Sequence, residues 1–148
     1  MTENSARKTW MSLLATAPDG RAAQLLDPSR LEAPFDWLRP PEIGSVMVQG
    51  RTGGTGAAFN LGEVTITRCS LQLASGEIGH GYVQGRRKDD ARTAALIDAL
   101  MQTDAATTLQ SCVLDTLDAE RTDRRTTRAS KAAATKVEFF TMARGENK

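Results

Sequence analysis

Apolar positions near the start of the chain recur with the spacing of one helix face. They are Trp10, Leu13, Leu14 and Ala17. This i, i+3, i+4, i+7 pattern predicts a helix over residues 5–17, which Pro18-Asp19-Gly20 ends. A second, shorter helix is predicted over residues 21–26, so the chain opens with a pair of helices.

Residues 34–41 combine apolar side chains with the adjacent prolines Pro40 and Pro41. Proline lacks a backbone donor and biases the residue before it toward extended backbone, so regular helix is excluded here. We therefore predict an extended connection that lies against the domain and leads into a first strand at about residues 43–50.

Period-two patterning predicts two further strands. In residues 63–73 the apolar positions change from even to odd numbers midway, which suits a bulge or a bend. In residues 78–83, larger side chains alternate with Gly79, Gly81 and Val83. One face of this third strand is nearly bare, so we expect a helix or another backbone against it. The short, glycine-punctuated runs predict a small, mainly antiparallel sheet over about residues 43–86.

The chain then turns helical, with Asp89 or Asp90 expected as the N-cap. Residues 91–101 leave little polar surface, which predicts a buried helix over about residues 89–102. Residues 118–128, in contrast, carry no apolar stripe. A helix that is polar on all sides bridges solvent, is held by charge pairs or depends on a partner.

Aromatic residues lie close to the end of the chain, where fraying is expected unless something covers them. The candidate interface residues are Phe139, Phe140, Met142 and Arg144. We therefore predict that residues 113–148 are a helical subunit-interface segment. The fold class expected is α+β, a single domain over residues 1–148 in which N-terminal helices and one buried helix pack on the sheet.

Composition narrows the possible functions. A chain of 148 residues is one domain by the usual expectation, and its formal net charge of +1 gives no global electrostatic case for nucleic acid or for a membrane surface. The two cysteines lack metal-ligand spacing, so two buried free thiols are expected. The polar N-terminus and the lack of a long apolar run predict a cytoplasmic protein.

The glycine-rich stretch Arg51-Thr52-Gly53-Gly54-Thr55-Gly56 is the first candidate for chemistry. The backbone amides of Gly53, Gly54 and Gly56 can turn inward as an anion nest, beside the charged donor Arg51. No Gly-Lys-Ser/Thr follows and a strand comes next, so neither the Walker A loop nor the dinucleotide fingerprint fits. The alternative is a wide hairpin loop whose glycines only permit positive φ.

The tetrapeptide Val48-Gln49-Gly50-Arg51 recurs as Val83-Gln84-Gly85-Arg86, each time at a predicted strand end. If the two strand ends lie side by side, Arg51 and Arg86 point at one place, which suits a triphosphate or a phosphonate. Chance repetition with two solvated arginines is the alternative.

His80 is the only histidine, and no carboxylate or cysteine lies at ligand spacing around it. A structural or interface role is favoured over catalysis. No nucleophile elbow, HExxH or CxxC pattern is present. We predict no catalytic residue and no metal ligand in this chain.

Four segments, in this order along nearly the whole chain, resemble the PhnG family, the small subunit of the bacterial carbon-phosphorus lyase system. They are Trp10-Met11-Ser12-Leu13-Leu14-Ala15, Arg51-Thr52-Gly53-Gly54-Thr55-Gly56, Val83-Gln84-Gly85-Arg86 with Ala95-Leu96-Ile97-Asp98-Ala99-Leu100-Met101-Gln102, and Val137-Glu138-Phe139-Phe140-Thr141-Met142-Ala143-Arg144-Gly145.

The resemblance implies an accessory role. Proteins of this family join the nucleosidase subunit PhnI, with PhnH and PhnL, to make α-D-ribose 1-methylphosphonate 5-triphosphate from MgATP and methylphosphonate, with release of adenine. They also form a core complex with PhnH, PhnI and the radical lyase subunit PhnJ. Catalysis is ascribed to PhnI, so the resemblance supplies no catalytic residue and no cofactor for this chain, and MgATP is a substrate of the complex.

Two functions are therefore possible for this chain. The first is an accessory subunit of a phosphonate-nucleotide synthase, whose donors at the edge of an active site would be Arg51, the loop amides and Arg86. The second is an independent phosphate- or nucleotide-binding module that uses the glycine-rich loop. A partner-dependent subunit is expected to be oligomeric or sticky, whereas a binding module is expected to be a compact monomer that nucleotide stabilises.

Overall fold

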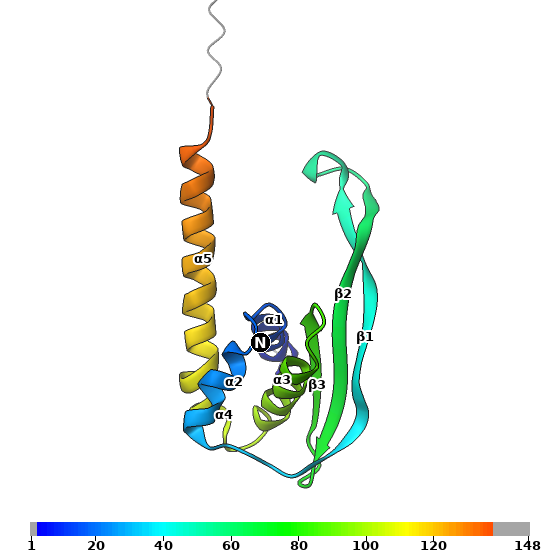
Figure 1. Ribbon diagram of the computed structural model, residues 1–148, viewed down its shortest axis with the longest axis vertical. Coiled ribbons are helices and arrows are strands. Elements are labelled where there is room, and N and C mark those ends of the chain that lie inside the picture. Colours follow the sequence, from blue (N-terminus) through cyan, green and yellow to red (C-terminus); the bar gives the residue numbers. More distant parts are fainter. Residues whose placement is uncertain (1–2, 138–148) are drawn as a thin grey trace, which may run out of the picture.

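The computed structural model describes residues 3–137 and has the predicted α+β architecture (Figure 1). A three-stranded antiparallel sheet has the order β1-β2-β3. Its strands are β1 (Phe35–Arg51), β2 (Ala58–Leu73) and β3 (Ile78–Gln84). The helices are α1 (Glu3–Ala15), α2 (Arg21–Leu26), α3 (Lys88–Leu100), α4 (Ala106–Leu109) and α5 (Asp115–Ala134). Short 3-10 turns occupy Asp27–Ser29 and Thr52–Gly54, and a π-helical turn at Gln110–Leu114 joins α4 to α5.

Helix α3 packs directly on the bare face of β3, as the alternation of glycines predicted. A Cβ atom built on Gly79 would lie 2.0 Å from the carbonyl oxygen of Ala95, and one on Gly81 would lie 2.1 Å from that of Ala91. Only glycine permits this approach of helix to strand. The buried helix is therefore confirmed, with bounds at Lys88 and Leu100.

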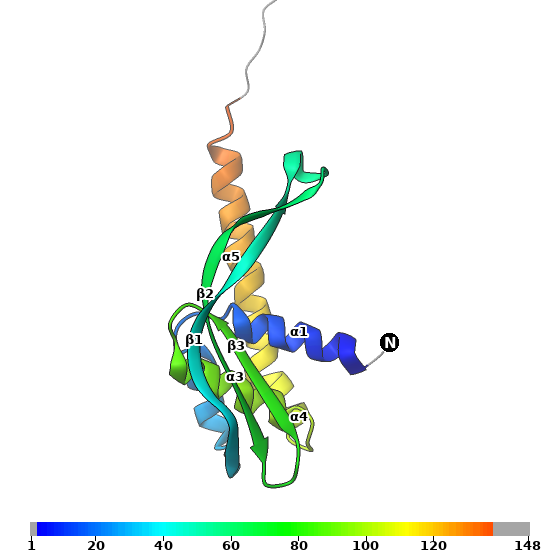
Figure 2. The ribbon, with the colours of Figure 1, turned by 90° about the vertical axis from the view of Figure 1, so that its right-hand side faces the viewer.

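The hydrophobic core lies between this sheet face, α3, the middle of α1 and the start of α5 (Figure 2). Its fully buried side chains include Leu71, Val83, Ile97, Leu109, Val113, Leu114 and Leu117. Helix α1 adds Leu13 and Leu14. Val113, Leu114 and Leu117 thus anchor the base of α5 in the body.

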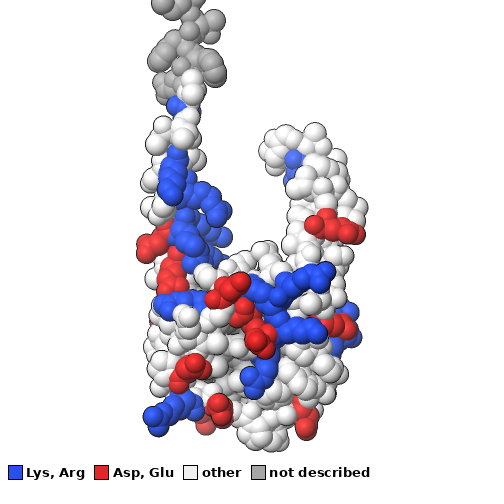
Figure 3. Space-filling model, viewed as in Figure 1, with Lys and Arg blue, Asp and Glu red and all other residues white. Residues whose placement is uncertain are grey.

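Two arms extend from this body in the same direction (Figure 1). One is a hairpin, because β1 pairs with β2 as far as Ala58, whereas β3 pairs only with Ile66–Gln72. The other is the distal part of α5, where every residue from Thr122 to Ala134 is exposed. The space-filling view shows open space between the two arms (Figure 3).

Three local predictions need correction. The predicted connection before the first strand is itself strand, since β1 begins at Phe35 and includes both prolines. As an edge strand β1 tolerates them, with register shifts on either side of Arg39. The predicted change from even to odd buried positions is present in β2, where Ile66 and the adjacent Thr67 are both buried. The extra residues of the register shifts around Arg39 lie in β1, however, and β2 begins at Ala58, earlier than predicted.

The residue that precedes α3 is Arg87, so neither predicted aspartate is the N-cap. Both Asp89 and Asp90 lie in the first turn of the helix. The carboxylate of Asp90 accepts instead from the backbone N–H of Gly20 at 3.0 Å, in the loop between α1 and α2. The predicted cap is wrong because α3 begins at Lys88, before both aspartates.

Among residues 3–137, no helix has both the length and the apolar character that a membrane span requires.

Candidate functional site

The glycine-rich loop forms the tip of the hairpin arm. Gly53 and Gly54 have positive φ values of 62° and 83°, which favour glycine. The backbone N–H of Gly56 donates to the carbonyl oxygen of Thr52 at 2.8 Å, and Arg51 Nη1 donates to the carbonyl oxygen of Gly56 at 3.2 Å. The guanidinium of Arg51 is therefore held beside the loop, and one of the three candidate glycine amides already has a partner inside it.

The register of the sheet separates the two repeated tetrapeptides. Arg51 lies opposite Ala58 on β2, whereas Gln84 lies opposite Ile66. Eight residues of strand correspond to about 26 Å at about 3.3 Å per residue. The two strand ends therefore do not lie side by side within this chain. Arg51 and the exposed Arg86 do not form one joint site.

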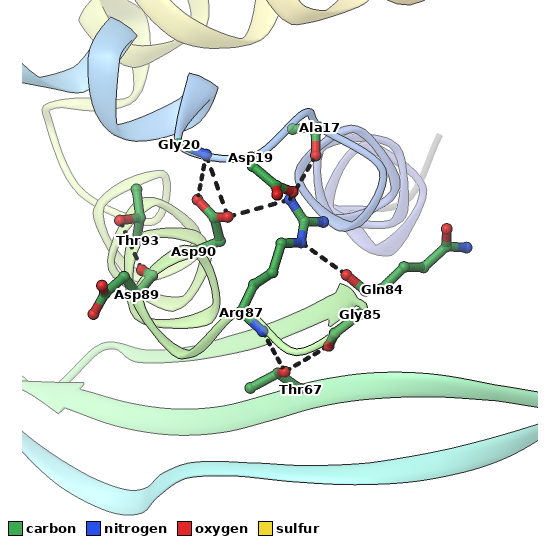
Figure 4. A network of polar contacts seen from close by, with 10 residues as sticks. All are labelled: Ala17, Asp19, Gly20, Thr67, Gln84, Gly85, Arg87, Asp89, Asp90 and Thr93. Carbon is green, nitrogen blue, oxygen red and sulfur yellow. Dashed lines mark hydrogen bonds and ion pairs between the residues drawn. The ribbon is translucent and has the colours of Figure 1, made fainter.

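The residue after Arg86 has a structural role that the sequence did not reveal. Arg87 Nη1 donates to the carbonyl oxygen of Ala17 at 2.9 Å and forms ion pairs with Asp19 Oδ1 at 3.1 Å and Asp90 Oδ2 at 3.2 Å (Figure 4). Its backbone N–H donates to Thr67 Oγ1 at 2.9 Å. The network joins the end of α1, the start of α3 and the middle of β2.

A second network surrounds Asp98, which is completely buried on α3. Its carboxylate accepts from Arg7 Nη2 at 2.8 Å, from Trp10 Nε1 at 2.8 Å and from the backbone N–H of His80 at 2.8 Å. The hydrogen bond to Asp98 raises the pKa of Arg7 above its ordinary value. The only sign of this network in the sequence was a single aspartate within an otherwise apolar helix.

This second network also closes part of the free edge of β3. The carbonyl oxygen of Ile78 accepts from Arg7 Nη2 at 3.2 Å and from Gln102 Nε2 at 2.8 Å. Unpaired strand edges can pair with other chains, and capping by side chains prevents this. Both networks thus hold elements together.

The two cysteines differ in their exposure to solvent. Cys69 is buried, and burial raises the pKa of its thiol to about 11. Cys112 is exposed, so the prediction of two buried thiols is wrong for this residue, which lies on the π-helical turn. Phe139, Phe140, Met142 and Arg144 lie outside the described residues. Within residues 3–137, no three histidine, cysteine or carboxylate side chains are grouped so that they could hold a metal ion.

The structure thus has a glycine-rich loop with one arginine on an arm, and two polar networks in the body, one of which centres on the buried Asp98. A family model described as "Phosphonate metabolism protein PhnG" matches residues 5–145. A curated relative from Rhizobium meliloti (strain 1021), named alpha-D-ribose 1-methylphosphonate 5-triphosphate synthase subunit PhnG, is 44% identical over 145 residues, which cover 95% of this chain and 90% of the relative. The match includes the body and both arms, and the chain belongs to the PhnG family of phosphonate metabolism proteins.

Proposed function

We propose that this chain is an accessory subunit of a complex that makes α-D-ribose 1-methylphosphonate 5-triphosphate from MgATP and methylphosphonate, with release of adenine. In this proposal the chemistry belongs mainly to a PhnI homologue, and homologues of PhnH, PhnJ and PhnL complete the assembly. The observation that carries it is the pair of arms, which extend beyond the core of the body.

The distal part of α5 lacks the contacts that keep a helix folded. Every residue from Thr122 onward is exposed as far as Val137. Isolated helices shorter than about 12–15 residues are marginal in water, so this segment depends on continuation from the body or on a partner. A protein partner that packs along it would supply the missing contacts.

Charge on α5 indicates what that partner surface offers. Residues 124–136 contain five cationic side chains and no carboxylate. Figure 3 shows basic side chains gathered along α5 and reaching toward the space between the arms. An acidic face on the partner subunit would complement this stretch.

The hairpin arm presents apolar side chains to solvent. Met47 is 52% exposed, Phe59 44% and Leu61 67%. A two-stranded hairpin is marginal by itself, and grouped exposed apolar residues mark contact surfaces. We infer that an apolar segment of the partner packs against this arm while its acidic face meets α5.

The same arm would carry the glycine-rich loop to the partner. Displacement of adenine needs donors for the triphosphate and for charge that develops in the transition state. In this proposal Arg51 and the amides of Gly53 and Gly54 supply such donors at the edge of the partner's active site, and Arg86 would contact it separately. An independent binding module is less favoured, because residues 51–55 are all exposed at the tip of an arm.

Co-expression with a PhnI homologue tests the proposal. Size-exclusion chromatography and an adenine-release assay with MgATP and methylphosphonate would compare the full chain with Arg51→Ala and with a chain that ends at Arg121. Arg30→Ala, an exposed arginine outside both arms, is the matched control.

We expect the shortened chain to lose the complex, because it keeps the buried Leu117 but lacks the exposed part of α5. An Arg51→Ala chain that assembles but releases adenine at least tenfold more slowly would support a role for the loop in catalysis. Assembly with unchanged activity would refute that role and leave the accessory role intact. Failure of the two full-length chains to associate would refute the proposed function.

A further inference from the structure

A pocket of about 540 Å³ lies between α1 and the outer face of the sheet. Side chains of β3 alternate between the face that packs on α3 and this outer face, where His80 and Tyr82 lie. Helix α1 contributes Lys8 and Met11 to the wall, and β2 contributes Arg68 and Ser70. The volume falls within the range of about 300–1,000 Å³ that is usual for small-molecule sites.

The lining of the pocket is cationic. Lys8, Arg39 and Arg68 all line it, and no carboxylate does so among the described residues. Glu42, outside the lining, accepts from Arg39 Nη1 at 2.7 Å and from Arg68 Nε at 2.6 Å. Hydrogen bonds from these two guanidiniums lower the pKa of Glu42. One carboxylate is thus shared between two cations, and Lys8 forms no ion pair with another described side chain.

The polar groups on the floor of the pocket stand on paired strands. Ser70 and His80 are directly opposite each other, and Ser70 Oγ lies 2.8 Å from His80 Nδ1. The backbone N–H of His80 donates to the buried carboxylate of Asp98. The contact with Asp98 fixes the backbone at His80, and the contact with Ser70 orients the imidazole with its Nε2 atom left for another partner. Sites held on rigid strands are organised before a ligand arrives.

An apolar side of the pocket lies beside these cations. Tyr82 is 41% exposed in it, and Met11 of α1 also lines it. An aromatic face and a thioether offer packing for a flat or apolar group. Lysine and arginine are the side chains that bind phosphate oxygens.

We propose that this pocket binds a small molecule that carries a phosphate or phosphonate group and an apolar part. Lys8 and Arg68 contact the anionic group, His80 Nε2 adds a hydrogen bond, and Tyr82 packs against the apolar part. This site is separate from the glycine-rich loop and does not depend on the proposed assembly.

The single histidine provides a direct reporter. The imidazole resonances of His80 in the full, ¹⁵N-labelled chain would be followed by NMR at constant ionic strength, during titration with ATP, inorganic tripolyphosphate or adenosine. We expect saturable shifts with ATP and with tripolyphosphate and none with adenosine.

Variants separate the two halves of the site. Lys8→Ala is expected to weaken both anions at least fivefold, and Tyr82→Leu is expected to weaken ATP but not tripolyphosphate. Lys88→Ala, an exposed lysine at the start of α3 that does not line the pocket, is the matched control and is expected to leave both affinities unchanged.

Three outcomes would overturn the proposal. They are the lack of a saturable shift at His80, an equal loss of affinity in Lys8→Ala and Lys88→Ala, and shifts confined to the amides of residues 53–56. The last result would assign the anion to the loop instead. Because these readouts use the chain without partners, they are independent of whether it joins a complex.

Discussion

At the scale of single residues, Asp98 is the strongest test of the packing. Asp98→Asn removes the negative charge opposite Arg7 and turns an amide N–H₂ toward groups that are all donors. Because the Arg7 side chain is 32% exposed, we expect a loss near the low end for a broken buried pair, about 3 kcal/mol. Urea unfolding would measure it. Asp104→Asn, at an exposed site, is expected to change stability by less than about 0.5 kcal/mol, and equal effects would contradict the structural role.

The glycines of β3 give a second residue-scale prediction. Gly79→Ala is expected to destabilise the fold by about 3 kcal/mol, because the new methyl group would meet the backbone of α3. Gly62→Ala is the matched control: this glycine also lies in a strand, but an added Cβ meets nothing within 4 Å. Thermal unfolding of both variants would test the approach of α3. Similar melting temperatures would show that α3 does not approach β3 this closely.

The raised pKa of the Cys69 thiol predicts how the stability of the fold changes at alkaline pH. Its pKa of about 11 lies above the ordinary value of 9.0, so the folded chain binds this proton more tightly than the unfolded chain does. The resulting stabilisation is fully present below about pH 9 and is lost as the pH rises through about 11. Urea unfolding at pH 8 and pH 10.5 should show a larger loss for the wild type than for Cys69→Ala. Parallel losses would contradict the assignment.

At the scale of elements, the hairpin arm should be dispensable for folding. The buried side chains of β2 begin at Ile66, so replacing residues 47–63 with an Asn-Gly turn between Val46 and Val64 removes no core residue. We expect a shift in free energy of unfolding within about 1 kcal/mol in urea. The shortened chain should nevertheless fail to join the proposed complex. A chain that no longer folds would show that the arm is part of the core.

The same elements show what the sequence can and cannot predict. The helix faces and the bare face of β3 were predictable, because burial on one side imposes a local period on the chain. The full length of the hairpin was not, since residues 58–63 of β2 are all exposed and show no alternation in burial. The pairing of Arg7 with Asp98 spans 91 residues and depends on how α1 lies across the edge of β3. No local pattern encodes such a contact.

At the scale of the whole molecule, the chain divides into a body with its own core and two arms without one. The charges of α5 follow this division. Residues 115–123 carry four carboxylates and one arginine, and the basic stretch comes only after them. Carboxylates near the N-terminus and cations near the C-terminus of a helix interact favourably with its macrodipole, so this order of charges also stabilises α5 itself. The basic end is the part farthest along the arm.

This division predicts how α5 behaves with and without a partner. In the isolated chain, backbone amides of residues 124–134 should exchange with deuterium faster than those around the buried Leu117, because no side chain packs over them. In the proposed complex they should become protected, and raising salt from about 0.1 M to 1 M should weaken the association, because the Debye length falls from about 10 Å to 3 Å. Replacing Arg124, Arg125 and Arg128 with glutamine should reduce that salt dependence, whereas the same change at Arg30 and Arg92, two exposed arginines outside both arms, should not. Equal protection of residues 124–134 in the free chain would instead mean that α5 is stable alone, and the case for a partner along it would be lost.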